Sequence, residues 1–267
     1  AANGAGCSIA PRVLRAAGAD VVVIAADPDG RNINDGCGAT HPELVAAAVV
    51  QHGADLGVAL DGDADRLIAV DGTGRVVDGD HIIAICAADL RGRGQLANDT
   101  VVVTVMTNLG FRLAMDTAGI NVVETGVGDR YVLEALVAGG HSLGGEQSGH
   151  VIFADHATTG DGLLTAVALI DIVKRSGSAL ADIASDAMTS LPQSLVNVRI
   201  ADRVSDVADR LVDEIAVVEA ELGATGRVLV RPSGTEPLIR VMVEAASADQ
   251  AEAAADQLAK VVRAKFA

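Results

Sequence analysis

Short apolar runs alternate with amphipathic stretches in the first part of the chain. The pattern predicts a strand at residues 21–25, a helix at 42–51 and a strand at 55–60. Thr40 and Glu43 have the spacing of a capping box, with Pro42 between them in the first turn of the expected helix. The order strand, helix, strand is typical of an α/β unit with a mostly parallel sheet.

The same rhythm then repeats, and it changes near residue 191. The second part predicts helices and strands in alternation: helix 80–90, strand 101–105, helix 109–118, strand 122–125, helix 129–138 and helix 161–175. The last part predicts an α+β order: strand 195–200, helix 204–222, strands 227–230 and 238–245, and helix 248–265. Ser247 and Gln250 form a second capping-box spacing. We therefore expect two tandem α/β domains, residues 1–76 and 77–190, and a smaller α+β domain, residues 191–267.

Composition narrows the classes of function. The 267 residues are 50% hydrophobic, which is enough for two or three ordinary cores. The formal net charge of -16 argues against nucleic acid as a partner, because phosphate-backbone binding needs a basic face. No apolar run approaches the roughly 20 residues that span a bilayer and no basic-then-apolar leader begins the chain, so a cytoplasmic protein without a membrane partner is expected. A monomer and a homodimer both remain open.

The numbers of cysteine and aromatic residues exclude further kinds of site. The three cysteines are widely spaced and form no CxxC pair, so neither a disulfide framework nor a zinc site is indicated. With three Phe, one Tyr and no Trp, an aromatic platform for a sugar is nearly excluded. Recognition of a sugar by this chain would have to be polar.

Three aspartates stand at alternate positions directly after the expected strand 55–60. Asp61, Asp63 and Asp65 would repel one another unless a cation lies between them, and hard oxygen ligands favour Mg²⁺. A solvated Asp-Gly turn is the alternative. A calcium EF-hand loop does not fit, because Arg66 and Gly72 stand where that loop needs Gly and Glu. The run therefore predicts a magnesium site.

Two further segments suggest anion and sugar contacts. The run 231–236 offers Ser and Thr hydroxyls, freed backbone N–H groups and a guanidinium, with Arg240 nearby, and these are the parts of a phosphate cradle. In the run 144–150, Glu146 and Ser148 are two residues apart and could bind neighbouring sugar hydroxyls, while His150 could transfer a proton. A plain turn and a plain loop remain the alternatives for these two segments.

The run 126–130 lies between an expected strand and an expected helix. Its glycines could present N–H groups to an anion, but the third glycine of a dinucleotide fingerprint is missing, so NAD binding is excluded. Arg130 is either part of an anion site or an ordinary surface arginine.

Taken together, DGDADR at 61–66, GEQSGH at 145–150 and RPSGTEP at 231–237 resemble the α-D-phosphohexomutase family in order and spacing, over essentially the whole chain. The resemblance implies Mg²⁺ binding in the second of four domains, sugar recognition in the third, and phosphate binding in a fourth domain that is similar to the TATA-box-binding protein. It implies one Mg²⁺ per chain and a sugar bisphosphate as intermediate and activator.

The resemblance also implies a role for each residue of the motifs. The metal ligands are Asp61, Asp63 and Asp65; the hydroxyl binders are Glu146 and Ser148; the phosphate cradle is Arg231, Ser233, Gly234, Thr235 and Arg240; and the active centre is lined by Arg66, Arg130 and His150.

Within the family, the run 28–40 and Gln147 are similar to bacterial, and most closely actinobacterial, members that interconvert glucosamine 6-phosphate and glucosamine 1-phosphate for cell-wall precursors. A mannose or glucose phosphate specificity is the first alternative, and an inactive module that only binds Mg²⁺ and phosphosugar is the second.

The serine loop of the family's first domain has no counterpart in this sequence. Residues 1–6 resemble the interior of the strand and turn that begin the second domain, so that strand is expected to be incomplete. The chain alone is then expected to be inactive.

Overall fold

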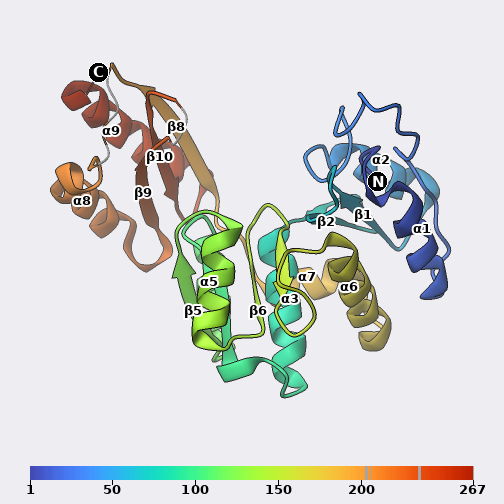
Figure 1. Cartoon of the computed structure of the whole chain (residues 1–267). Helices are drawn as coiled ribbons and strands as arrows, with labels where there is room; N and C mark the ends of the chain where they lie inside the picture. Colours follow the sequence, from blue (N-terminus) through green and yellow to red (C-terminus); the bar gives the residue numbers. More distant parts are fainter. Residues whose placement is uncertain (202–203, 205, 234–235, 267) are drawn as a thin grey trace. The chain divides into compact units, whose positions relative to one another are not determined.

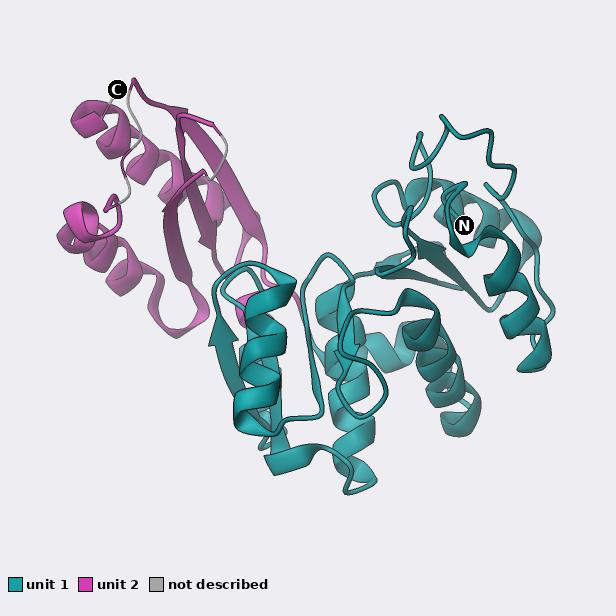
Figure 2. Ribbon diagram, viewed as in Figure 1, with its two compact units in different colours: residues 1–107, 111–189 teal, residues 108–110, 190–267 magenta. Residues whose placement is uncertain are grey.

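The chain forms two compact units, shown in separate colours in Figure 2. The computed structural model describes residues 1–201, 204, 206–233 and 236–266. Unit 1 comprises residues 1–107 and 111–189, and unit 2 comprises residues 108–110 and 190–267. The division into three domains at residues 76 and 190 stays a prediction.

The first sheet of unit 1 is antiparallel and has helices on both faces (Figure 1). Its strands are β1 (Leu56–Leu60), β2 (Leu67–Asp71) and β3 (Val76–Val77). Helix α2 (Glu43–His52) packs on one face, and α1 (Gly6–Ala16) and α6 (Gly162–Ser176) cover the other. The expectation of a mostly parallel first sheet was therefore wrong. The loop 61–66 turns the chain straight back onto β1, and so short a connection can join only antiparallel neighbours.

Two local expectations near this sheet also fail. Residues 21–24 form no strand and pair with no strand of the described residues, and Ala25 takes a left-handed conformation with φ of 47°, which ends the run. Helix α2 begins after Pro42 without a side-chain cap, so the capping box at Thr40 is not formed. The Glu43 carboxylate instead contacts the His41 ring, with 2.9 Å between Oε1 and Nδ1.

The second sheet of unit 1 has the order β5-β4-β6-β7, and its first three strands are parallel. The strands are β4 (Thr100–Thr104), β5 (Asn121–Thr125), β6 (Leu143–Gly145) and β7 (Val151–Phe153). The associated helices are α3 (Gly79–Gly92), α4 (Leu109–Thr117), α5 (Asp129–Gly139) and α7 (Leu180–Ala187). The expected elements of this part are confirmed to within two residues. The short strands β6 and β7, together with α7, were not predicted.

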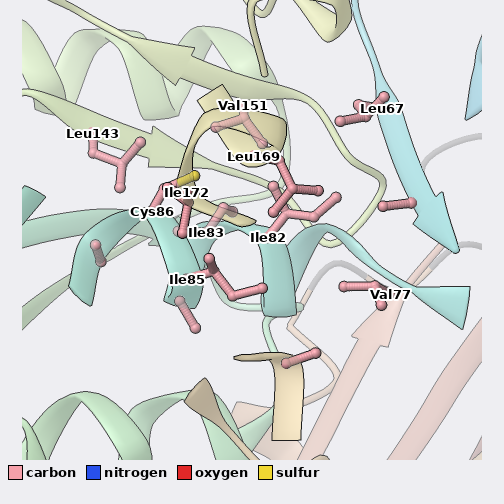
Figure 3. Close-up of a cluster of buried hydrophobic side chains, with 14 of the residues drawn as sticks. Leu67, Val77, Ile82, Ile83, Ile85, Cys86, Leu143, Val151, Leu169 and Ile172 are labelled. Carbon is pink, nitrogen blue, oxygen red and sulfur yellow. The ribbon is translucent and has the colours of Figure 1, made fainter. Parts of the chain in front are cut away.

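Helix α3 lies at the centre of the unit 1 core (Figure 3). Its residues from Gly79 to Ala87 are all buried, so this part of the helix is covered on every side, while its last turn reaches the surface. The Asp78 side chain caps its start by accepting a hydrogen bond from the His81 N–H. None of the helices in the described part of the chain is long and apolar enough to cross a membrane.

Unit 2 is an antiparallel sheet of order β8-β10-β9 that packs against two helices (Figure 1). Its elements are β8 (Gln193–Arg199), α8 (Val212–Leu222), β9 (Arg227–Pro232), β10 (Leu238–Glu244) and α9 (Ala248–Phe266). The expected helix 204–222 is shorter than predicted: α8 follows a 3₁₀ turn at Asp209–Leu211, and residues 202–203 and 205 lie outside the described part. At α9, the Gln250 N–H donates to Ser247 Oγ, which is one half of the expected capping box.

A buried carboxylate anchors unit 2. Glu244 is 0% exposed. Its Oε2 accepts from Arg227 Nε at 3.0 Å and from the Leu109 N–H at 2.9 Å, and its Oε1 accepts from Asn108 Nδ2 at 3.2 Å. The carboxylate thereby joins the segment 108–110 to the sheet of unit 2.

Glu244→Ala is expected to lower the free energy of unfolding of unit 2 by about 3–5 kcal/mol, because it leaves a buried guanidinium without its carboxylate. Urea unfolding followed by circular dichroism measures the change. Glu221→Ala, on the exposed face of α8, is the control and is expected to change stability by about 0.5 kcal/mol at most. A loss below about 1 kcal/mol for Glu244→Ala would contradict the anchoring role.

Candidate active site

The loop 61–66 gathers three carboxylates between β1 and β2. Asp61, Asp63 and Asp65 each offer an oxygen, and these oxygens lie within 4.8 Å of one another. Ala64 adopts a left-handed conformation, with φ of 66°, which curls the loop around the three side chains. The aspartates predicted as a metal site are thus brought together.

The electrostatics of this loop favour a cation. Burial raises the pKa of Asp61; the hydrogen bond from the Arg66 N–H opposes that shift, and the neighbouring carboxylates Asp65 and Asp63 add to it. Arg66 Nε lies 3.8 Å from both Asp61 Oδ2 and Asp65 Oδ1, too far for a hydrogen bond. Asp65 Oδ1 is buried and has no hydrogen-bond partner among the described residues. A metal ion would satisfy this oxygen and relieve the repulsion.

His150 is buried and holds Asp65 in place. Its Nδ1 lies 3.1 Å from Asp65 Oδ2, and its Nε2 accepts a hydrogen bond of 3.0 Å from the Gly160 N–H. The second contact places the ring proton on Nδ1, so both ring nitrogens are engaged. Gly160 cannot carry a side chain here, because a Cβ would come within 2.6 Å of the imidazole. In this arrangement His150 orients a candidate metal ligand, and the proton-transfer role stays a prediction.

The loop 145–150 is joined directly to the loop 61–66, which is called the metal loop below. Arg66 and His150 form a β-bridge, and the Leu67 N–H donates to the Gly149 carbonyl at 3.0 Å. Gly149 has φ of 93°, and a Cβ at this position would lie 2.2 Å from the Leu67 carbonyl oxygen, so the approach requires glycine. The sequence motifs at 61–66 and 145–150 therefore form one continuous surface.

Within the loop 145–150, the side chains of Glu146 and Ser148 have different surroundings. Glu146 Oε1 accepts a hydrogen bond of 3.1 Å from the Gly128 N–H, which links the loop to the turn 126–128, and Ser148 is exposed. Arg130 follows that turn, but its side chain is 80% exposed and pairs with Glu134 at 2.8 Å. Hydrogen bonding to Glu134 raises the pKa of Arg130. No hydrogen bond or ion pair between Arg130 and the loop 61–66 occurs among the described residues.

The sequence did not predict the hydrogen bonds between the start of α3 and the loop 145–150. The Gly79 N–H donates to the Gln147 carbonyl at 3.1 Å, and Asp78 Oδ1 lies 2.7 Å from His81 Nδ1. Burial tends to raise the pKa of Asp78, but hydrogen bonds from His81 and from the Gln147 side chain outweigh burial and lower it. The sequence signal that could have revealed the Asp78–His81 contact is an aspartate at a helix start, three residues before a histidine.

Unit 2 places two arginines opposite each other. Arg231 of β9 and Arg240 of β10 are direct partners in the strand register, where like charges repel. Burial lowers the pKa of Arg231, and the charge of Arg240 lowers it further. Arg240 Nε is buried without a hydrogen-bond partner among the described residues. An anion bound between the two guanidinium groups would relieve this repulsion.

The turn after β9 carries the rest of the expected phosphate cradle. Ser233 is buried, its N–H donates to the Leu238 carbonyl at 2.9 Å, and its Oγ accepts from the Glu236 N–H at 3.3 Å. Gly234 and Thr235, also predicted for the cradle, lie outside the described residues.

Three family models match consecutive parts of the chain. They describe phosphoglucomutase/phosphomannomutase alpha/beta/alpha domain II (residues 1–74), alpha/beta/alpha domain III (residues 78–191) and the C-terminal domain (residues 195–261). The chain belongs to the phosphoglucomutase/phosphomannomutase family. The resemblance to α-D-phosphohexomutases is therefore confirmed, and so is the α/β fold class that it implied.

Relatives and solved structures of the family are similar to most of this chain. Proteins named phosphoglucosamine mutase are 62% identical in Frankia casuarinae and 60% identical in Thermobifida fusca, each over 98% of this chain and 58% of the relative. An Aspergillus fumigatus N-acetylphosphoglucosamine mutase, solved with GlcNAc-6P and magnesium, aligns with a TM-score of 0.80 at 24% identity over 98% of this chain and 60% of that one. A Burkholderia thailandensis phosphoglucomutase/phosphomannomutase family protein aligns with a TM-score of 0.81 at 24% identity over 99% of this chain and 59% of that one. The chain thus spans a little over half the length of these proteins.

Proposed function

We propose that this chain carries the metal, sugar and phosphate sites of a phosphoglucosamine mutase, an isomerase that interconverts glucosamine 6-phosphate and glucosamine 1-phosphate. The choice of sugar rests on relatives of that name at 54–62% identity. The observation that carries the catalytic part is the joined surface of unit 1, where three carboxylates within 4.8 Å adjoin the loop 145–150.

The metal site fits Mg²⁺. Asp61, Asp63 and Asp65 would hold the ion, since carboxylate oxygens are its preferred protein ligands and Asp65 Oδ1 has no other partner among the described residues. When bound, the ion would supply positive charge next to the phosphoryl group in transfer, which is the main catalytic requirement of this chemistry. The residues of the chain set the position of that charge: His150 orients Asp65, and Arg66 adds a cation beside Asp61.

The remaining residues bind the substrate. Glu146 accepts hydrogen bonds from sugar hydroxyls, and Ser148 donates to them or accepts from them. Arg231, Ser233 and Arg240, together with Gly234 and Thr235 of the same sequence run, hold the phosphate that does not react. Two guanidinium groups and a hydroxyl suit a dianionic phosphate, because charge-assisted hydrogen bonds to its oxygens are short and strong. A phosphoserine from outside this chain would donate the phosphoryl group and form a sugar bisphosphate.

Turnover of sugar phosphates tests this proposal in the longer protein, including the sequence that flanks this chain. We expect kcat/KM for glucosamine 6-phosphate to exceed that for mannose and glucose phosphates by at least about tenfold. A preference for mannose phosphate would overturn the sugar assignment. Calorimetric titration of the chain itself with Mg²⁺ tests the metal site separately, and absence of binding would overturn that site whatever the sugar.

A further inference from the structure

The start of helix α6 is in direct contact with the metal loop. The Gly162 N–H donates to the Ala64 carbonyl at 2.9 Å. A Cβ at Gly162 would lie 2.3 Å from the Arg66 carbonyl oxygen and 2.7 Å from Leu60 Cδ2, so the helix and the loop meet without room for a side chain. The close approach of α6 to the loop therefore requires glycine at this position.

The contact is made to a residue of the metal loop in an unfavourable backbone conformation. Ala64 has φ of 66°, which is costly for a residue with a Cβ, and such a conformation persists only where the surrounding contacts fix it. The Ala64 N–H donates to the Asp61 carbonyl at 3.2 Å, and the Ala64 carbonyl accepts from Gly162. These hydrogen bonds hold the peptide units on both sides of Ala64. The second unit carries the N–H of Asp65, so the contact with α6 also sets the backbone of this aspartate.

The same run of chain fixes the Asp65 side chain. The Gly160 N–H donates to His150 Nε2 at 3.0 Å, and His150 Nδ1 lies 3.1 Å from Asp65 Oδ2. Gly160 acts through the His150 ring, and Gly162, two residues later, acts through Ala64. Asp65 is therefore held at its side chain and at its backbone by one short run of the chain.

Asp161, between the two glycines, fastens this run to α6 and to β7. Its Oδ1 accepts from the Leu163 and Leu164 N–H groups, each at 2.9 Å, which makes it the N-cap of the helix. Its own N–H donates to the Val151 carbonyl at 3.4 Å. Every N–H from residue 160 to residue 164 thus has a partner, and a shift of the run would break the cap of α6.

We propose that residues 160–162, called the clamp below, fix the geometry of the metal loop, and that Mg²⁺ binds tightly only while they do. The inference rests on the proposed metal site and adds to it three positioning residues, which act through Ala64 and His150. Removal of a group that orients a metal ligand typically weakens metal binding by about ten- to a hundredfold. Disruption of the clamp should have an effect of that size while unit 1 stays folded.

Titration calorimetry of the chain with Mg²⁺ tests the clamp first by glycine substitution. Gly162→Ala introduces the Cβ that meets the Arg66 carbonyl oxygen, and Kd for Mg²⁺ should rise by about ten- to a hundredfold. Gly92→Ala, at the end of α3, is the matched control and should leave Kd unchanged, because a Cβ there has nothing within 4 Å. An unchanged Kd in folded Gly162→Ala would overturn the proposal.

Two substitutions of Asp161 provide a second comparison that introduces no clash. Asp161→Ala and Asp161→Asn remove the same charge, but only asparagine keeps an oxygen that can cap α6. Asp161→Ala should raise Kd for Mg²⁺ by at least about tenfold, and Asp161→Asn should keep Kd close to that of the unchanged chain. Equal Kd values for the two variants would contradict a positioning role, because the cap would then have no influence on the metal.

Amide exchange without Mg²⁺ separates failure of the clamp from failure of the metal site. The Arg66 N–H donates to Asp61 Oδ1 at 3.2 Å, so its exchange reports the geometry of the metal loop. Asp161→Ala should speed exchange at Arg66 by at least about tenfold relative to buried Val102 of β4, which reports global unfolding, and Asp161→Asn should not.

The outcomes of the two measurements are distinct. If the unchanged chain bound no Mg²⁺, the proposed metal site would be lost, and the exchange rates at Arg66 would still support or overturn the clamp. Equal acceleration at Arg66 and Val102 would mean that the clamp contributes only to overall stability, and the proposal would then be wrong.

Discussion

Asp63→Asn is expected to abolish magnesium binding by the chain and to lower kcat of the longer protein by about a thousandfold or more. The substitution keeps the shape of the side chain and removes one of three charged ligands. Loss of several kcal/mol of charge stabilisation at a transferring phosphoryl group corresponds to a rate loss of that size. Calorimetry with Mg²⁺ and a turnover assay with glucosamine 6-phosphate measure the two effects.

The same substitution should have the opposite effect on the metal-free fold. The pKa of Asp61 is raised by burial and by its carboxylate neighbours, so ionisation of Asp61 costs stability as the pH rises from the ordinary carboxyl range through the raised pKa. Asp63→Asn removes one of the repelling charges. Without Mg²⁺, Tm at neutral pH should therefore stay equal or rise, and addition of Mg²⁺ should no longer raise it.

Asp116→Asn, on the exposed surface of α4, is the matched control and should retain both the Mg²⁺-dependent rise in Tm and the turnover. If Asp63→Asn unfolds the metal-free protein, the carboxylates act as structural hydrogen-bond acceptors and the metal assignment is lost.

The metal loop could be predicted from sequence because its information is local. Three carboxylates within five residues, directly after an apolar strand, repel one another whatever the rest of the fold does. The partners of these carboxylates could not be predicted in the same way. His150 is 85 residues from Asp65 along the chain, and Gly160 must be glycine because a Cβ there would lie 2.6 Å from the His150 ring that its N–H contacts. Such contacts depend on how β2 and the loop 145–150 pair.

The direction of the first sheet and the presence or absence of individual strands also depend on distant parts of the chain, so they could not be predicted from local sequence. The sequence of β1 is that of a buried strand, but its antiparallel pairing with β2 comes from the short connection 61–66, which the alternating pattern does not reveal. Residues 21–24 have the β-branched, apolar composition of a strand, but a strand also needs a pairing partner, which composition does not supply. Strands β6 and β7 are three residues each, too short for a period of two to be recognised.

Arg240→Gln is expected to weaken the binding of phosphorylated sugars to the chain strongly. Arg231 and Arg240 are opposite each other on adjacent strands, and Arg240 Nε is buried with no hydrogen-bond partner among the described residues. A charge-assisted hydrogen bond contributes about 1.5–3 kcal/mol, so Kd for glucosamine 6-phosphate should rise by about ten- to a hundredfold. Titration calorimetry on the chain measures this change.

Stability separates this binding role from a structural one. Because the two guanidinium groups repel each other, Arg240→Gln should leave the unfolding free energy of unit 2 unchanged or raise it, and should move the pKa of Arg231 back toward its ordinary value. Arg263→Gln, on the exposed surface of α9, removes the same charge elsewhere and should leave Kd unchanged. Equal weakening by both substitutions would mean that net charge alone attracts the substrate. A loss of stability with unchanged Kd would mean that Arg240 serves the fold, and the phosphate site would then have to lie elsewhere.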